Sequence, residues 1–158
     1  MSLGRLLKLD RLPAWVPVAA RLLLGTLFLI AALPKLTDPP GFAKAVWNYQ
    51  LVPGRLLAPM ALTLPWLELL CGLALLAGVW VRPAATWLAI LLLSFMGALG
   101  LNLVRHHPVD CGCFATSSAH KTEAERLRDM KLDLARDVGI LLLAGLVLAS
   151  GGKTRREP

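Results

Sequence analysis

Cys111 and Cys113 are the residues of this chain whose type and spacing are best suited to chemistry. One glycine separates them, so a disulfide between them closes a very small, strained ring, and strained disulfides are the more oxidising and labile ones. Two thiols do redox work when one is reachable as a thiolate and the other resolves a mixed disulfide. Gly112 relieves backbone strain and gives a partner close access. The pair therefore predicts thiol–disulfide exchange rather than a structural cross-link.

Two other interpretations of this segment stay open. His106, His107 and His120, together with the two cysteines, supply soft and borderline ligands for zinc or copper. Their spacing is not that of a standard zinc knuckle, and adjacent histidines do not easily bind one ion. Alternatively, the two cysteines are free or separately paired surface residues. Because the chain has only three cysteines, finding two of them here favours redox use ahead of both alternatives.

A second group of candidates lies within the apolar segments. Glu68 is a carboxylate near the middle of one of them, and an ionisable residue inside a membrane is by default a functional hypothesis. We expect Arg21 to be its partner, because the two lie within about two helical turns in depth and a long arginine side chain reaches that far. Such a pair either handles a proton or fixes helix packing. Cys71, one turn from Glu68, is expected to be a small core residue rather than a relay thiol.

Three further polar residues, Asn102, Arg136 and Asp137, lie near the ends of the apolar segments that flank the cysteine pair. We expect Asn102 and Arg136 to brace the cysteine loop or to meet a quinone headgroup. Asp137 is expected to form an interfacial salt bridge. Pro65 is expected to kink or locally open the helix just before Glu68.

The elements that must position these residues are strongly apolar. The chain has 158 residues, of which 56% are hydrophobic, a composition typical of a membrane protein rather than a soluble domain. The apolar segments 16–33, 56–81 and 84–104 are near the ~20 residues needed to cross a bilayer. Segment 138–149 reaches that length only if 132–136 continue the same helix. We predict an all-α fold, an integral membrane four-helix bundle with four transmembrane helices.

The connections add detail to this bundle. Pro34 and the Asp38-Pro39-Pro40-Gly41 segment are expected to end the first helix, and Arg82-Pro83 to form the turn between the second and third. A short interfacial helix is expected over 42–51. The polar stretch 122–134 is expected to form a helix that feeds the fourth span.

Domain limits and orientation follow from the charges. The membrane domain is expected over 13–150, between a basic segment 1–12 and a basic tail 151–158, and segment 16–33 is expected to be a span rather than a cleaved signal peptide. Uncompensated positive charge at the termini and at Arg82 favours the cytoplasm for both ends. The cysteine loop then faces the oxidising side. The net charge of +7 is spread over tails and loops, so lipid headgroups are expected partners and nucleic acid is not.

A series of short motifs runs along the chain. In order they are Arg21-Leu-Leu-Leu-Gly25, Pro34-Lys35-Leu36, Phe42, Tyr49 with Leu51-Val-Pro53, Pro65 with Glu68 and Gly72, Asn102, Asp110-Cys-Gly-Cys-Phe114, and Arg136-Asp137. This series resembles MauE-like proteins of the DoxX superfamily. The similarity covers about residues 16–150, and the Asp110–Phe114 element is its specific part. Ala115 stands where such proteins commonly have glycine, and 115–135 lack the tryptophan that relatives often carry. These departures point to a loop shaped for a different partner.

The resemblance implies a four-helix bundle in the bacterial inner membrane, with the cysteine loop in the periplasm or outside the cell. It also implies a role in the redox maturation of exported proteins, beside a thioredoxin-like protein or a disulfide-containing client. In methylamine utilisation the family member assists assembly of the disulfide-rich small subunit of methylamine dehydrogenase. The broader superfamily includes a quinone-linked thiosulfate oxidoreductase subunit, so a membrane quinone is the implied carrier, although the residues themselves fix no cofactor.

The implied site has Cys111 and Cys113 as the catalytic pair, supported by the neighbouring Asp110, Gly112 and Phe114. The residues leave open whether the chain is a thiol–disulfide oxidoreductase or a subunit of a quinone-linked one. Two alternatives from other classes also stay open. One is a non-catalytic assembly factor whose cysteines only dock a partner, and the other is a metal-binding membrane protein.

Overall fold

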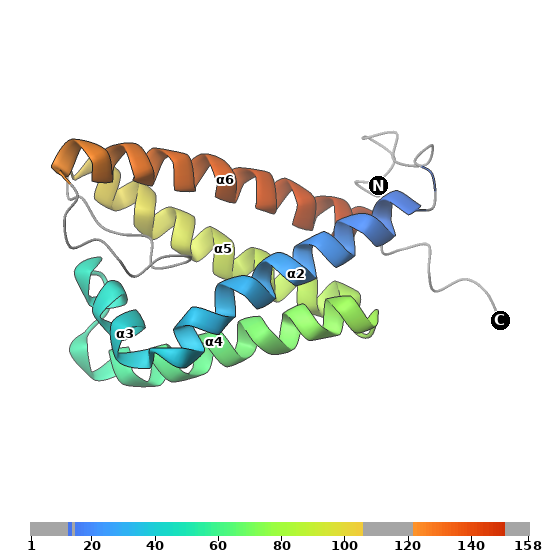
Figure 1. The fold of residues 1–158 in the computed structure, drawn as a ribbon, viewed down its shortest axis with the longest axis horizontal. Coiled ribbons are helices and arrows are strands. Elements are labelled where there is room, and N and C mark those ends of the chain that lie inside the picture. The colour runs from blue at the N-terminus through green and yellow to red at the C-terminus, as the bar shows by residue number, and fades with distance from the viewer. Residues whose placement is uncertain (1–12, 14, 106–121, 151–158) are drawn as a thin grey trace.

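The computed structural model describes residues 13, 15–105 and 122–150 (Figure 1). These residues form five helices and no strand, so the predicted all-α class is confirmed for this part of the chain. The helices are α2 (Trp15–Thr37), α3 (Pro39–Asn48), α4 (Gly54–Ala77), α5 (Val81–Val104) and α6 (Glu123–Ser150).

Three of these helices, α2, α4 and α5, are long and apolar enough to cross a bilayer. They correspond to the first three predicted spans. The fourth predicted span lies in α6, which is one continuous helix of 28 residues with a charged first half. The prediction that 122–134 feed the last helix is therefore confirmed. Among the described helices, α2, α4 and α5 meet the length and composition needed for a span, whereas the charged first half of α6 keeps it below them.

The long helices pack as two antiparallel pairs, α2 with α4 and α5 with α6 (Figure 1). In the first pair the backbones approach closely where Gly25 faces Gly72. A Cβ atom added to Gly25 would lie 2.9 Å from the carbonyl oxygen of Gly72. Small residues at a crossing allow this approach because they bring no side chain between the helices.

The main core joins the two pairs near the N-terminal end of α2. Leu24, Leu75 and Leu88 are fully buried there, and Ala144 and Val147 complete the core from α6. Toward the other end the pairs diverge, and α3 lies beside them (Figure 1). The bundle therefore has one end at which the two pairs pack on each other, and another end at which α3 lies beside them, which we call the open end because the backbones of the two pairs diverge there.

α3 packs through two separate apolar clusters at the open end. Phe42 and Val46 pack against Ala61 of α4. Tyr49, just after α3, packs against Leu99 of α5 and Met130 of α6. The prediction of a short helix between the first two spans is confirmed, three residues earlier than expected, since α3 occupies Pro39–Asn48.

One expected helix end is wrong. α2 continues through Pro34 to Thr37. A proline in the last turn costs the helix only one backbone hydrogen bond, and the helix tolerates this loss. The helix stops before Asp38, whose carboxylate accepts a hydrogen bond from the Gly41 backbone N–H at 2.9 Å and so caps α3.

The turn between α4 and α5 is also displaced from its predicted position. α4 closes at Gly78, which has a φ of 75°, and α5 follows directly after Trp80. Arg82 and Pro83 lie inside the first turn of α5 rather than forming the connection. Proline is tolerated there because the first N–H groups of a helix have no partner within it.

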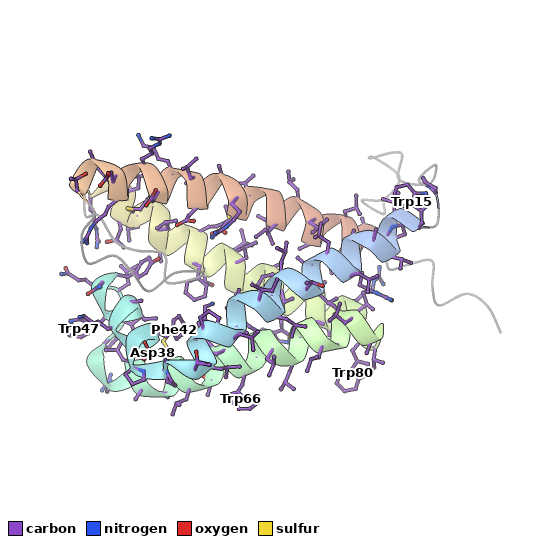
Figure 2. The ribbon with its side chains drawn as sticks, viewed as in Figure 1. Trp15, Asp38, Phe42, Trp47, Trp66 and Trp80 are labelled. Carbon is purple, nitrogen blue, oxygen red and sulfur yellow. The ribbon has the colours of Figure 1, made fainter. Side chains whose placement is uncertain are left out.

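Tryptophans mark the outside of the bundle. Trp15 and Trp80 lie at one end, and Trp47 lies at the other end on α3 (Figure 2). All three are more than half exposed, as is Trp66 on the outer side of α4. Indole rings at both ends of apolar helices are typical of the two membrane–water interfaces.

Candidate functional site: a buried charged pocket between the helix pairs

Lys35 and Glu68 form a buried ion pair at the open end of the bundle. Lys35 comes from the last turn of α2, and Glu68 comes from the middle of α4. The ammonium Nζ donates to both carboxylate oxygens of Glu68 at 2.8 Å. The two residues are 3% and 2% exposed, so the pair is held inside the protein.

Two phenyl rings complete the surroundings of the ammonium. Nζ of Lys35 lies 5.2 Å from the ring centroid of Phe42 on α3 and 5.3 Å from that of Phe95 on α5. A cation within about 6 Å of an aromatic face is attracted by the ring, more strongly where water is excluded. Lys35 thereby connects its own helix to α3, α4 and α5.

A second buried carboxylate, that of Asp137, faces the same region from α6. Asp137 is 3% exposed, and its Oδ1 accepts one hydrogen bond, from Nη2 of Arg136 at 3.3 Å. Nη1 of Arg136 is paired with Asp133 at 3.1 Å. Lys35 and Asp137 line the same pocket, so their opposite charges attract each other.

These groups surround a pocket of about 30 Å³. Lys35, Glu68 and Asp137 are its ionisable lining residues among those the structure describes, and the rest of its wall is apolar. The apolar lining residues are Leu27, Phe28, Ala31, Leu91, Leu92, Phe95 and Ile140. The pocket therefore lies between the two helix pairs, with one basic and two acidic side chains in an apolar surrounding.

The expected pairing of Glu68 with Arg21 is wrong. The guanidinium of Arg21 lies over Gly78, at the C-terminal end of α4. A Cβ atom added to Gly78 would be 2.8 Å from Nη1 of Arg21. That position is about 15 Å along the helix from Glu68. A cation is favoured there because the last carbonyl groups of α4 carry partial negative charge. In addition to Arg21 and Glu68, two more ionisable residues, Lys35 and Asp137, therefore lie within the helices, and both are buried.

The sequence did contain a signal for Lys35. The buried face of α2 includes Leu24, Phe28 and Ala31, a spacing of three or four residues, and Lys35 is the next position of this series. The expected helix end at Pro34 hid this periodicity. Continuing the helix by one turn would have placed Lys35 on the buried face.

Asn102 and Arg136 have partners of their own. Asn102 is 2% exposed, and its amide donates to the backbone carbonyl of Tyr49 at 3.3 Å and to that of Ala98 at 3.0 Å. It thus fastens the end of α3 to α5. Arg136 bridges Asp133 and Asp137, so the expected salt bridge of Asp137 exists, but this carboxylate is buried at the pocket rather than interfacial.

Cys71 and Pro65 both lie in the packed part of α4. Cys71 is a buried free cysteine in the main core, beside Leu75, as a small apolar residue is expected to be. Pro65 is also buried, and α4 continues through it as one helix.

The predicted cysteine site lies outside the described residues. Cys111 and Cys113, with their neighbours Asp110, Gly112 and Phe114 and with the three histidines, belong to residues 106–121. The described chain stops at Arg105, after α5, and resumes at Thr122, before α6, at the end of the bundle that carries α3 (Figure 1).

The start of α6 is capped by Thr122 and Glu125. Oγ1 of Thr122 accepts a hydrogen bond from the Glu125 N–H at 3.4 Å, and the Glu125 carboxylate accepts one from the Thr122 N–H at 2.8 Å. This reciprocal arrangement is a capping box, which fixes where a helix begins.

Apolar helices long enough to cross a bilayer, arranged around buried charged groups, define a helical membrane protein. Residues 13–150 match the model of the family described as methylamine utilisation protein MauE, and the chain belongs to this family.

Three relatives carry the name methylamine utilization protein MauE. The relative from Methylophilus methylotrophus is 41% identical over 99 residues, which cover 62% of this chain and 52% of the relative. The one from Paracoccus denitrificans is 38% identical over 97 residues, covering 61% and 52%. The one from Methylorubrum extorquens is 36% identical over 107 residues, covering 67% and 58%. The matched part of the chain thus spans about half the length of these curated relatives. No solved structure matches the chain.

Proposed function

We propose that this chain is a membrane accessory protein of methylamine utilisation that supports thiol–disulfide exchange in exported proteins through Cys111 and Cys113. The observation that carries the proposal is membership of the MauE family, in a chain whose segment between α5 and α6 contains a Cys-Gly-Cys sequence. A vicinal pair of this kind favours a labile disulfide over a structural one.

The proposal includes α6 as a fourth span. Residues 138–149 are free of charge, and Ile140, Ala144 and Val147 belong to the main core. α6 packs along α5 (Figure 1), so a bilayer that surrounds α5 also surrounds the apolar half of α6. Four spans put both termini on one side, and their basic residues favour the cytoplasm. The Cys-Gly-Cys segment then faces the periplasm or the cell exterior, in the inner membrane of a bacterium.

In the proposed exchange, a thiolate of a reduced client attacks the Cys111–Cys113 disulfide and forms a mixed disulfide. The second thiol of the client attacks the client's own sulfur in that bond and releases the pair as a dithiol. Two electrons and two protons pass from the client to the pair, and the client leaves oxidised. The reverse sequence reduces a client disulfide. The client class is an exported protein with disulfides, or a thioredoxin-like protein that passes electrons on.

A quinone does not fit the pocket between the helix pairs. The volume of about 30 Å³ accommodates about two water molecules, far less than an aromatic ring with its substituents. Lys35 and Glu68 are also bonded to each other, so two of the three ammonium donors are already used. We therefore derive no step through a quinone at this site.

Trapping of the mixed disulfide tests the proposal. Cys111→Ser and Cys113→Ser are made separately in the full chain, cells are quenched with an alkylating agent, and proteins are separated without reductant. We expect one of the two variants to accumulate an adduct with an exported protein that reductant releases. Cys71→Ser is the matched control, because Cys71 is buried in the core and should change nothing.

The absence of any adduct from both variants would contradict exchange. If the Cys111→Ser/Cys113→Ser double variant also supports full growth on methylamine, the chain is an assembly factor and the exchange proposal is wrong. Stoichiometric zinc or copper in the purified protein, lost in the same double variant, would instead identify a metal-binding protein.

A further inference from the structure

The pocket contains one more carboxylate than its cation can neutralise. Of the described residues that line it, Lys35 is the cation, while Glu68 and Asp137 are acids. Both oxygens of Glu68 are bonded to the Lys35 ammonium at 2.8 Å, so this pair is balanced. Asp137 is left with one longer bond, at 3.3 Å, from a guanidinium that also pairs with Asp133.

The other oxygen of Asp137, Oδ2, accepts no hydrogen bond from the described residues and is not a fully enclosed atom, so it borders the pocket. Burying an ionised carboxylate is costly unless it is paired and fully hydrogen-bonded. A group in this position lowers its free energy by binding a proton, which removes the charge and supplies an O–H donor.

We propose that the pocket formed by Lys35, Glu68 and Asp137 is a proton-binding site, in which Asp137 carries one exchangeable proton. Water completes the site, because about 30 Å³ holds about two molecules and the site offers several polar partners. A protonated Asp137 donates into this water, and the Lys35–Glu68 pair stabilises the water from the opposite wall.

The site spans the interface between the two helix pairs. Lys35 and Glu68 belong to α2 and α4, whereas Asp137 belongs to α6. Loss of the proton gives Asp137 a full negative charge, which attracts the Lys35 ammonium across the pocket in competition with Glu68. Binding and release of the proton therefore change the attraction between the helix pairs.

Among the described residues, four charged groups face Asp137 and contribute to its proton affinity. They are Lys35 from α2, Glu68 from α4, and Arg136 with Asp133 from α6 itself. The lining residues of α5 are Leu91, Leu92 and Phe95, which do not titrate. The proposal goes beyond the exchange function and does not involve residues 106–121.

Infrared difference spectroscopy of the full chain in lipid nanodiscs tests this site. A protonated carboxyl group has its own carbonyl stretching band, which shifts in D₂O. At neutral pH we expect a band equivalent to one group per chain, which falls reversibly as the pH is raised. The band is expected to be absent in Asp137→Asn. It is expected to persist in Asp129→Asn, the matched control about two turns earlier on α6, which does not line the pocket.

Two results would overturn the site. One is a wild-type spectrum with no exchangeable carboxyl band at neutral pH, a measurement that does not depend on the folding of any variant. The other is a full-strength band in folded Asp137→Asn. The Cys111→Ser/Cys113→Ser double variant should keep the band, so failure of the thiol-exchange proposal and failure of the proton site are told apart.

Discussion

At the scale of single residues, the Lys35–Glu68 pair is the contact whose disruption should matter most for stability. Both groups are almost completely buried, and each is the main partner of the other. Removing one member leaves the other as an uncompensated buried charge, or forces it to change protonation. The contribution of each residue to stability therefore depends strongly on the presence of the other.

We expect Lys35→Met and Glu68→Gln each to lower the free energy of unfolding by about 3–5 kcal/mol. The Lys35→Met/Glu68→Gln double variant should lose much less than the sum, because neither residue is then left with an unpaired charge. Unfolding in detergent micelles measures all three. Lys44→Met, on the exposed side of α3, is the matched control and should stay close to wild type. Strict additivity of the two single effects would contradict the pairing.

Sequence reasoning identified one half of this site. Glu68 was found because a carboxylate inside an apolar segment is conspicuous by itself. Lys35 was missed because it follows Pro34, a residue expected to end the helix. Asp137 was assigned to an interface, since its burial depends on α2 and α4, which lie far away in the sequence.

At the scale of elements, the approach of α2 and α4 depends on two glycines. Gly25 and Gly72 meet backbone to backbone, and any added carbon atom at Gly25 contacts a carbonyl oxygen that cannot move aside. A Cβ atom on Gly25 that meets the backbone of α4 must push α2 and α4 apart. The glycine crossing therefore sets the distance between the two helices, and the Lys35–Glu68 contact depends on this distance.

We expect Gly25→Ala to destabilise the protein by about 1–3 kcal/mol, the usual range for overpacking. Gly97→Ala is the matched control, because a Cβ at this position on α5 meets no atom of the described residues within 4 Å. Alanine is the better helix former, so the control should be neutral or slightly stabilising. Thermal unfolding of both variants in the same detergent measures the two effects on stability. Equal effects of the two changes would show that the crossing is looser than the structure indicates.

Elements were predictable where their signals are local. The helix over 122–134 was predicted from its helix formers and i,i+4 charge pairs, and the capping box of Thr122 and Glu125 in the structure starts α6 there. The α4–α5 turn was misplaced because Arg82-Pro83 resembles a break. The structure uses the left-handed backbone of Gly78 instead and accepts Pro83 in the first turn of α5.

At the scale of the whole molecule, the number of spans decides where the termini lie. If α6 crosses the membrane with α2, α4 and α5, both termini lie on one side of the membrane and residues 106–121 lie on the other. If α6 does not cross, the C-terminus lies on the same side as the cysteine pair.

Reporter fusions distinguish these arrangements. We expect a fluorescent protein that folds only in the cytoplasm to be active when fused after Pro158, and an exported phosphatase to be active when fused after Arg105. A membrane-impermeant thiol reagent should also label Cys111 and Cys113 in intact cells. Cys71 should stay unlabelled, because it is buried in the bundle. An active cytoplasmic reporter after Arg105 would reverse the orientation.

The sequence by itself determined the all-helical class, the three apolar helices α2, α4 and α5, and the place of the cysteine pair between the last two long helices. These features depend on composition and on periodicities within one segment, which each segment carries independently of the others. Only the tertiary structure decided that Glu68 pairs with Lys35 rather than Arg21, and that Asp137 joins them at one pocket. Such contacts depend on how separate helices cross, and that geometry is set by packing over the whole bundle rather than by any one segment.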